Sequence, residues 1–153
     1  MRPITLLSSL ALVLAVATPA FAAGDAEILA VTASSTDGML MDAVDGDLAT
    51  AWRNKRDGER EAWLAVRFEG PAQLRGVRLN VGALPPDVTF DIEGSVDGVG
   101  YQTYLKDQKS PQDKTMELAF PRKVAAVYLR VRFAYQGNGQ APRYQVRELE
   151  PLE

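Results

Sequence analysis

The sequence predicts an all-β fold, an antiparallel jelly-roll β-sandwich, from three observations. Several segments alternate apolar and polar side chains with a period of two, which is typical of half-buried antiparallel strands. Stretches rich in Gly, Pro, Asp and Asn separate these segments and predict turns. Helix signals are weak after the first 22 residues. Many short strands with frequent turns are typical of sandwiches and jelly rolls.

The expected strands are segments in which every second side chain is apolar. In "VTFDIEGS", for example, Val88, Phe90 and Ile92 share one face, and the polar residues between them share the other. The same pattern predicts strands over 61–68, 74–81, 88–95, 115–120 and 127–135. The intervening turns are expected at "EGP", "ALPPD", "SVDGVG", "KSPQD" and "GNGQAP".

The first residues have the features of a secretory signal peptide. Arg2 supplies a positive start, an apolar run extends from Leu6 to Ala17, and small residues surround the expected cleavage site after Ala22. The alternative is an uncleaved membrane anchor, but the apolar run is short for a bilayer. We therefore expect a signal peptide over residues 1–22, one domain over residues 23–153, and a secreted or periplasmic location without a transmembrane segment.

The composition excludes several classes of function. The chain has 153 residues, no cysteine, no histidine and a formal net charge of -3. The absence of cysteine excludes disulfides, and the absence of histidine excludes a Ser-His-Asp triad and the commonest zinc ligand. Mild acidity disfavours general nucleic-acid binding.

The stretch "MDAVDGDLATAW" places three aspartates within six residues, directly before a tryptophan. It is not an EF-hand loop, because that loop needs a glutamate at its twelfth position and Arg53 stands there. The aspartates either surround a cation or form a solvated turn, since Asp-Gly is a common turn pair.

The order of six segments resembles a discoidin domain, also called the coagulation factor 5/8 type C domain. These segments are "VTASST", "AVDGDLATAW", "AWLAVRFEGPAQLRGVRL", "FDIEGSVDG", "VYLRVRF" and "YQVRELEPL". The family is galactose-binding-like and is similar to family 32 carbohydrate-binding modules. The resemblance implies a jelly roll that covers nearly the whole expected domain, with Trp52 in its core.

The resemblance also implies a structural Ca²⁺ in the acidic loop. Its side-chain ligands would come from Asp45, Thr50 and Glu148, and its carbonyl ligands from Asp42, Asp47, Thr50 and Arg147. A mixture of carboxylate, hydroxyl and carbonyl oxygens is what Ca²⁺ prefers.

In such folds ligands bind to loops at one end of the sandwich. The candidate loops here are 53–60, 82–87 and 134–144, and the candidate ligand-binding residues are Arg53, Asn54, Arg56, Tyr135, Asn138 and Tyr144. Galactose-binding relatives often use a histidine, which this chain lacks, so galactose itself is in doubt. The alternative is that these are ordinary solvated loops.

A set of arginines falls on the expected strands: Arg67, Arg75, Arg78, Arg130 and Arg132. Cross-strand pairing with Asp and Glu is the favoured interpretation. The alternative is a basic patch for an anionic polysaccharide or a lipopolysaccharide headgroup.

We expect an exported, non-catalytic module that binds a glycan or an envelope surface ligand. The alternative is a periplasmic scaffold that binds another exported protein. An enzyme is a weaker third hypothesis, based on the carboxylate pairs Glu59/Glu61 and Glu148/Glu150, because glycosidases use two carboxylates.

Overall fold

The computed structural model describes residues 26–153, so the expected signal peptide and its cleavage site lie outside the described residues. No helix in this part of the chain is long and apolar enough to cross a membrane. The elements are β1 (Ile28–Ala33), the 3-10 helix η1 (Leu40–Ala43), β2 (Trp52–Arg53), β3 (Glu61–Asn80), β4 (Val88–Ser95), β5 (Gln102–Gln108), β6 (Met116–Tyr135), β7 (Gln145–Val146) and β8 (Glu148–Leu152).

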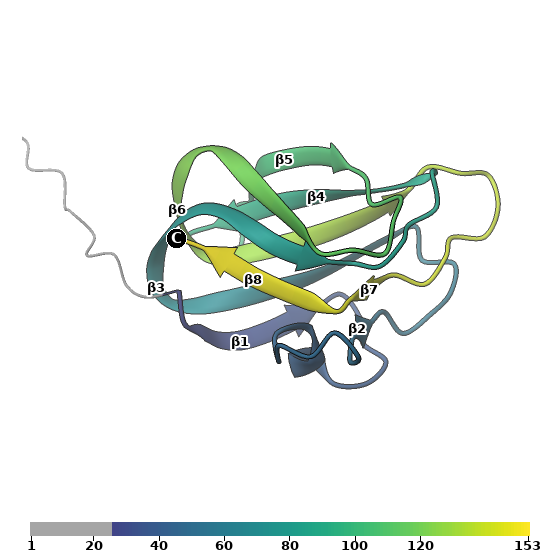
Figure 1. Ribbon diagram of the computed structural model, residues 1–153, viewed down its shortest axis with the longest axis horizontal. Helices are drawn as coiled ribbons and strands as arrows, with labels where there is room; N and C mark the ends of the chain where they lie inside the picture. The colour runs from purple at the N-terminus through teal and green to yellow at the C-terminus, as the bar shows by residue number, and fades with distance from the viewer. Residues whose placement is uncertain (1–25) are drawn as a thin grey trace, which may run out of the picture.

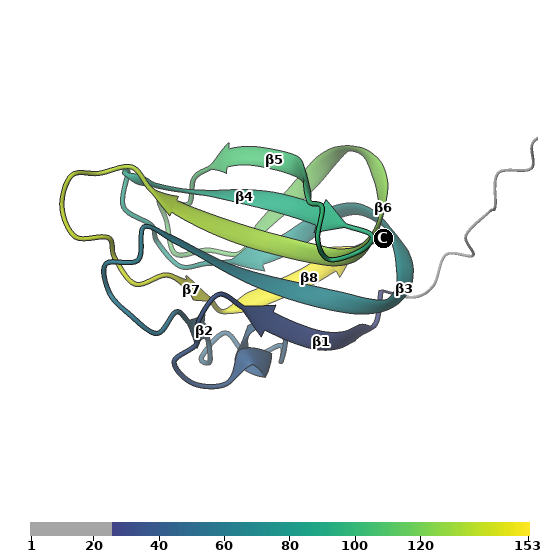
Figure 2. The same cartoon turned by 180° about the vertical axis from the view of Figure 1, so that it is seen from behind.

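The predicted antiparallel β-sandwich is confirmed. The main sheet has the order β1-β3-β6-β4-β5, with β8 also paired to β3, and β2 and β7 form a small second sheet. All strand pairs are antiparallel. Figure 1 shows β8 in front of the layer that contains β1 and β4, and Figure 2 shows that layer from behind.

Two long strands connect the layers, where the sequence predicted four short ones. The segments 61–68 and 74–81 belong to the continuous strand β3, and 115–120 and 127–135 belong to β6. The prediction of a turn at "EGP" is therefore wrong. The β3–β6 register skips between Arg67 and Ala72, so Pro71 sits in an unpaired bend where its missing N–H costs no ladder hydrogen bond.

The core follows the predicted alternation. Most apolar side chains of the expected strands are buried, together with Trp52 as the family resemblance implied, whereas Met116, Leu118 and Val127 are half-buried. The sequence pattern predicts a solvated polar face for β4, but Asp91 and Glu93 on that face are also buried. Arg130 donates to Glu93 at 2.7 Å, and Arg132 donates to Asp91 at 3.2 Å. These arginines on β6 cover and neutralise the carboxylates of β4.

Cross-strand pairing also accounts for most of the strand arginines, as expected. On the other part of β3, Arg78 pairs with Glu150 at 2.6 Å, and Arg75 pairs with Glu117 at 3.8 Å. Among residues 26–153, Arg67 is the one member of the set that forms no ion pair. The sheet therefore does not present the alternative basic patch.

Two glycines on β3 offer a matched test of this architecture. A Cβ on Gly76 would collide with the backbone carbonyl of Leu118 on β6, whereas a Cβ on Gly70 would meet nothing. We expect Gly76→Ala to lower the free energy of unfolding by about 1–3 kcal/mol, because the paired backbones must separate. Gly70→Ala should leave it unchanged or raise it by about 0.4–1 kcal/mol. Chemical denaturation measures both, and equal losses would contradict the close β3–β6 approach.

Candidate functional site

Three loops converge at the end of the sandwich opposite the C-terminus (Figure 1). The Gly58 N–H donates to the Ala141 carbonyl at 2.9 Å, and the Gln136 N–H donates to the Asp87 carbonyl at 2.8 Å. These bonds connect the 53–60, 134–144 and 82–87 loops, which confirms that the first two are neighbours. We call this surface the loop end.

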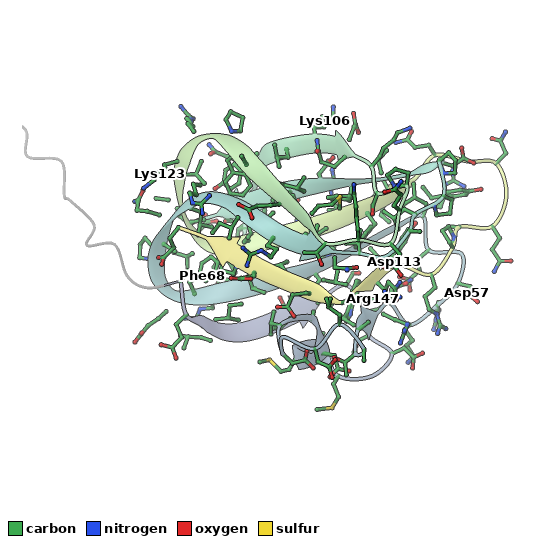
Figure 3. The ribbon with its side chains drawn as sticks, in the orientation of Figure 1. Asp57, Phe68, Lys106, Asp113, Lys123 and Arg147 are labelled. Carbon is green, nitrogen blue, oxygen red and sulfur yellow. The ribbon has the colours of Figure 1, made fainter. Side chains whose placement is uncertain are left out.

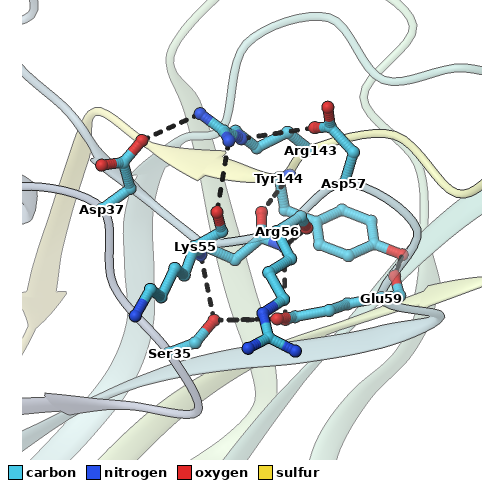
Figure 4. A network of polar contacts seen from close by, with 9 residues as sticks. Ser35, Asp37, Lys55, Arg56, Asp57, Glu59, Arg143 and Tyr144 are labelled. Carbon is cyan, nitrogen blue, oxygen red and sulfur yellow. Dashed lines mark hydrogen bonds and ion pairs between the residues drawn. The ribbon is translucent and has the colours of Figure 1, made fainter.

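A buried clamp holds the loop end together. The Asn54 side chain has no exposed area; its Oδ1 accepts from the Tyr144 N–H at 2.7 Å, and its Nδ2 donates to the Arg56 carbonyl at 2.8 Å. Tyr144 is equally buried, and its ring stacks on Phe133 with centroids 5.1 Å apart. Figure 4 shows Tyr144 and Arg56 among the polar contacts of this region.

Asn54 and Tyr144 were expected on the recognition surface, and this expectation is wrong. The period-two alternation explains it, because Trp52 and Asn54 share the inner side of one segment, and Tyr144 and Val146 share that of the other. Burial raises the pKa of Tyr144 to about 12, so its hydroxyl stays protonated and donates to the Glu59 carbonyl at 2.8 Å. Both residues support the loops and do not face a ligand.

The sequence analysis missed further supporting residues. Ser35 accepts from the Lys55 N–H at 3.0 Å and donates to Glu59 at 3.2 Å. Arg143 donates to Asp37 at 2.9 Å and pairs with Asp57 at 3.3 Å (Figure 4). These contacts join segments far apart in the sequence, so no local pattern could have revealed them.

Among the exposed side chains of the loop end that form no ion pair within residues 26–153, cations outnumber the one carboxylate, Asp87. Arg53, Lys55 and Arg56 are exposed, and none of them forms an ion pair within residues 26–153. Asn138 is also exposed. Tyr135 is half-buried, with the Arg60 guanidinium 5.1 Å from its ring centre. The geometry suits an anionic ligand, since free cations lie on loops that are already ordered.

The acidic loop brings several of the expected metal ligands together. The Thr50 hydroxyl donates to Asp45 Oδ2 at 2.7 Å and lies 2.9 Å from the Asp47 carbonyl oxygen. Glu148 accepts from the Gly46 N–H at 2.9 Å, which brings its carboxylate to the same loop. The Asp47 carboxylate instead accepts from the Ala49 N–H at 2.8 Å and shapes the turn.

The other two expected ligands have different surroundings. Asp42 lies on η1, and the Arg147 N–H donates to the Asn80 carbonyl at 2.8 Å while its side chain binds Asp113 at 2.7 Å. Residues 26–153 contain no group of three acidic side chains placed to hold a metal ion. A cation here would therefore need carbonyl and hydroxyl oxygens besides the two carboxylates, as Ca²⁺ accepts.

The electrostatics of this loop agree with its geometry. Hydrogen bonds from the Thr50 hydroxyl and the Asp47 N–H lower the pKa of Asp45, so its carboxylate stays charged. Burial raises the pKa of Glu148, and the charge of Asp45 raises it further. Two neighbouring carboxylates that form no ion pair within residues 26–153 favour a bound cation.

The carboxylate pairs behind the enzyme hypothesis have structural contacts. Glu59 accepts from Ser35 and Asn54, and Glu61 lies 3.9 Å from Arg132. Glu150 pairs with Arg78 on the neighbouring strand β3, while Glu148 faces the acidic loop. These contacts explain the position of each carboxylate, and none of them calls for a catalytic role.

Comparisons with solved structures show the same fold. A pectin-binding carbohydrate-binding module is 23% identical with a TM-score of 0.67, covering 84% of this chain and 92% of that chain. The family 32 module of AlyQ, in complex with 4,5-unsaturated mannuronic acid, is 21% identical with a TM-score of 0.64, covering 83% and 96%. Chitosan-binding module 1 of a chitosanase/glucanase from Paenibacillus sp. IK-5 is 22% identical with a TM-score of 0.69, covering 84% and 97%.

The sequence comparisons give one match. No curated protein matches this chain significantly. The family model described as the F5/8 type C domain matches residues 30–148, from β1 to the start of β8. Because this match spans most of the chain and the strands follow the expected sandwich, this protein belongs to the F5/8 type C domain family.

Proposed function

We propose that this protein is a non-catalytic module that binds an acidic glycan through its loop end. The observation that carries the proposal is the set of exposed cations without ion pairs, Arg53, Lys55 and Arg56, on loops held by a buried clamp. A guanidinium forms paired hydrogen bonds with a carboxylate, and an ammonium adds a point charge. The chain as a whole is acidic, so the attraction is local to this surface.

The loop end also offers groups for the uncharged part of a sugar. Asn138 and Gln140 are exposed side-chain amides that suit hydroxyl groups, and Tyr135 is a half-buried ring beside them. The Tyr135 hydroxyl accepts from the Gly139 N–H at 3.1 Å, which orders the loop before any ligand arrives. Ordered loops lose little conformational entropy on binding, and affinity rises accordingly.

The similar structures support a glycan as the ligand. They include a pectin-binding module, a chitosan-binding module and a complex with an unsaturated mannuronic acid. The same fold therefore carries sites for chemically different sugars, and the side chains of the loops determine which one binds. In this chain those side chains are cationic, which favours a sugar acid over a cationic sugar.

We further propose that Ca²⁺ binds in the acidic loop and stabilises the fold. The Asp45 and Glu148 carboxylates, the Thr50 hydroxyl and the Asp47 carbonyl would hold it, with Asp42 and Arg147 contributing carbonyls. A bound divalent cation would neutralise the two carboxylates and join this loop to β8. The ion would have a structural role, because the loop end does not need it to present its cations.

A second candidate function rests on a different surface. Met39, Met41 and Leu48 expose 66%, 51% and 49% of their area around η1 and the acidic loop. Exposed apolar side chains that gather in one region favour contact with another protein. This observation supports the alternative of a scaffold that binds another exported protein. Export itself is part of the proposal and rests on the expected signal peptide.

The glycan proposal predicts a charge-dependent affinity. We expect the triple variant Arg53→Gln, Lys55→Gln, Arg56→Gln to lose about tenfold or more in affinity for tetramannuronate, because charge-assisted hydrogen bonds contribute about 1.5–3 kcal/mol. Isothermal titration calorimetry measures this, with mannotetraose as the neutral probe.

The matched control for that experiment replaces two exposed lysines elsewhere, Lys106→Gln and Lys114→Gln. These should leave the affinity within about twofold at physiological salt, since distant exposed charges are screened. If the control pair and the loop-end triple weaken binding equally, the loop end does not form the site.

The calcium proposal predicts a metal-dependent stability. A ligand that binds the folded state alone, at a hundredfold excess over its Kd, adds about 2.7 kcal/mol. EDTA should therefore lower the melting temperature by several degrees, and added Ca²⁺ should restore it. Asp45→Ala should abolish the response, Glu148→Gln should nearly abolish it, and Asp47→Ala should weaken it less because its carbonyl remains.

Glu69→Gln provides the control, because Glu69 is exposed on the bend of β3 and should leave the response unchanged. Differential scanning fluorimetry on protein first freed of metal measures all four variants. If neither EDTA nor Ca²⁺ changes the melting temperature, the calcium proposal is wrong and the acidic loop is an ordinary solvated turn.

A further inference from the structure

A groove lies between the edge strand β5 and the bend of β6. Its volume is about 450 Å³, and Gln102, Thr103, Tyr104, Phe120, Arg122 and Val124 line it. A smaller cavity of about 160 Å³ continues it past Tyr104 toward Gly94. Ligand pockets in proteins commonly have volumes of about 300–1,000 Å³. We call this feature the β5–β6 groove.

The groove results from how β6 changes layers. The β3–β6 register skips between Ala119 and Val124, so the intervening residues bend without pairing. At the other wall β5 pairs only with β4, which leaves its second edge open. Lys123, on the bend of β6, lies at the end of the molecule opposite Asp57 of the loop end (Figure 3).

The groove has an aromatic wall in a fixed position. The rings of Tyr104 and Phe120 lie 5.0 Å apart at 51°, and Phe120 joins the core. A Cβ on Gly94 would collide with the Tyr104 ring, so a glycine is needed for the ring to lie there. Burial raises the pKa of Tyr104, which agrees with a ring partly withdrawn from water.

The rim of the groove is polar and positively charged. Arg122 on this rim is exposed, as is the adjacent Lys123, which does not line the groove, and no ion pair within residues 26–153 involves either of them. Gln102 and Thr103 are exposed beside them and offer an amide and a hydroxyl. An aromatic wall, two neutral hydrogen-bonding groups and a free guanidinium are the groups that an acidic sugar needs.

We propose that the β5–β6 groove is a second glycan site, which takes an acidic saccharide. The apolar face of the sugar ring packs on Tyr104, its carboxylate pairs with Arg122, and its hydroxyls bond to Gln102 and Thr103. No residue of the loop end lines this groove, so it can bind a saccharide whether or not the loop end does. If both bind, which rests on the proposed function, one molecule bridges two segments of polysaccharide and gains avidity.

The test is a titration of isotope-labelled protein with tetramannuronate, followed by amide NMR. We expect two separate groups of shifted amides, one in the loop end and one over 102–104 and 120–124. Arg122→Gln should raise the Kd of the second group about tenfold and leave the first unchanged. Gln102→Ala should weaken the second group as well, and neither exposed side chain is needed for folding.

Lys123→Gln is the matched control, because it removes an adjacent charge that does not line the groove. If Arg122→Gln and Lys123→Gln raise the Kd of the second group equally, the attraction is unspecific and the proposal is overturned. An absence of shifts over 102–104 and 120–124 at millimolar tetramannuronate would also overturn it. The loop-end triple variant separates the two claims, since it should raise the Kd of the first group of shifts and leave that of the second unchanged.

Discussion

The pairing of β3 with β6 runs through both layers of the sandwich, and the positions of all three candidate sites depend on it. Glu61 at the start of β3 faces Ala134 near the end of β6, which brings the 53–60 and 134–144 loops together. Near the other end of β3, Asn80 faces Glu148 of β8, which directs that carboxylate to the acidic loop. The bend of β6 opens the groove beside β5.

The charged side chains of this protein divide into two groups by their surroundings. On the sheets, Arg130 and Arg132 satisfy Glu93 and Asp91, and the cost of burying these carboxylates is offset by paired hydrogen bonds. At the loop end, cations such as Arg56 have no acidic partner among the described residues. The buried carboxylates of the sheet are thus paired within the protein, whereas several exposed cations, including those of the loop end, have no ion-pair partner within residues 26–153.

The polar interior of the loop end makes this separation possible. Asn54 bonds to two loops at once, because its side-chain amide accepts from the Tyr144 N–H and donates to the Arg56 carbonyl. Arg143 forms ion pairs with both Asp37 and Asp57 and so joins two further segments of the chain. Because these bonds order the backbone, the exposed side chains are presented on a rigid frame. A loop region without this clamp would have to be ordered by the ligand at a cost in affinity.

Much of the fold was determined by the sequence alone. Period-two alternation located the strands of the core, because it reports which side chains leave water, and the position of Trp52 followed from the family resemblance. The candidate loops, which the family resemblance implied, do lie together at one end of the sandwich, although Arg53 belongs to β2 and residues 134–135 belong to β6. Arg53 and Arg56 were among the predicted residues because they lie on one of these loops and carry hydrogen-bonding side chains, and both are exposed.

The tertiary structure decided what depends on partners distant in the sequence. "EGP" has turn-forming residues, yet the pairing of β3 with both β1 and β8 carries the chain through it as a bend. Asn54 and Tyr144 are residue types that are common on binding surfaces. They bond to each other across 90 residues of sequence, however, and packing at that contact buries both. The groove beside Tyr104 arises because the outer edge of β5 and the bend of β6 are both unpaired. Local propensity cannot encode such contacts, because they exist only once the layers have packed.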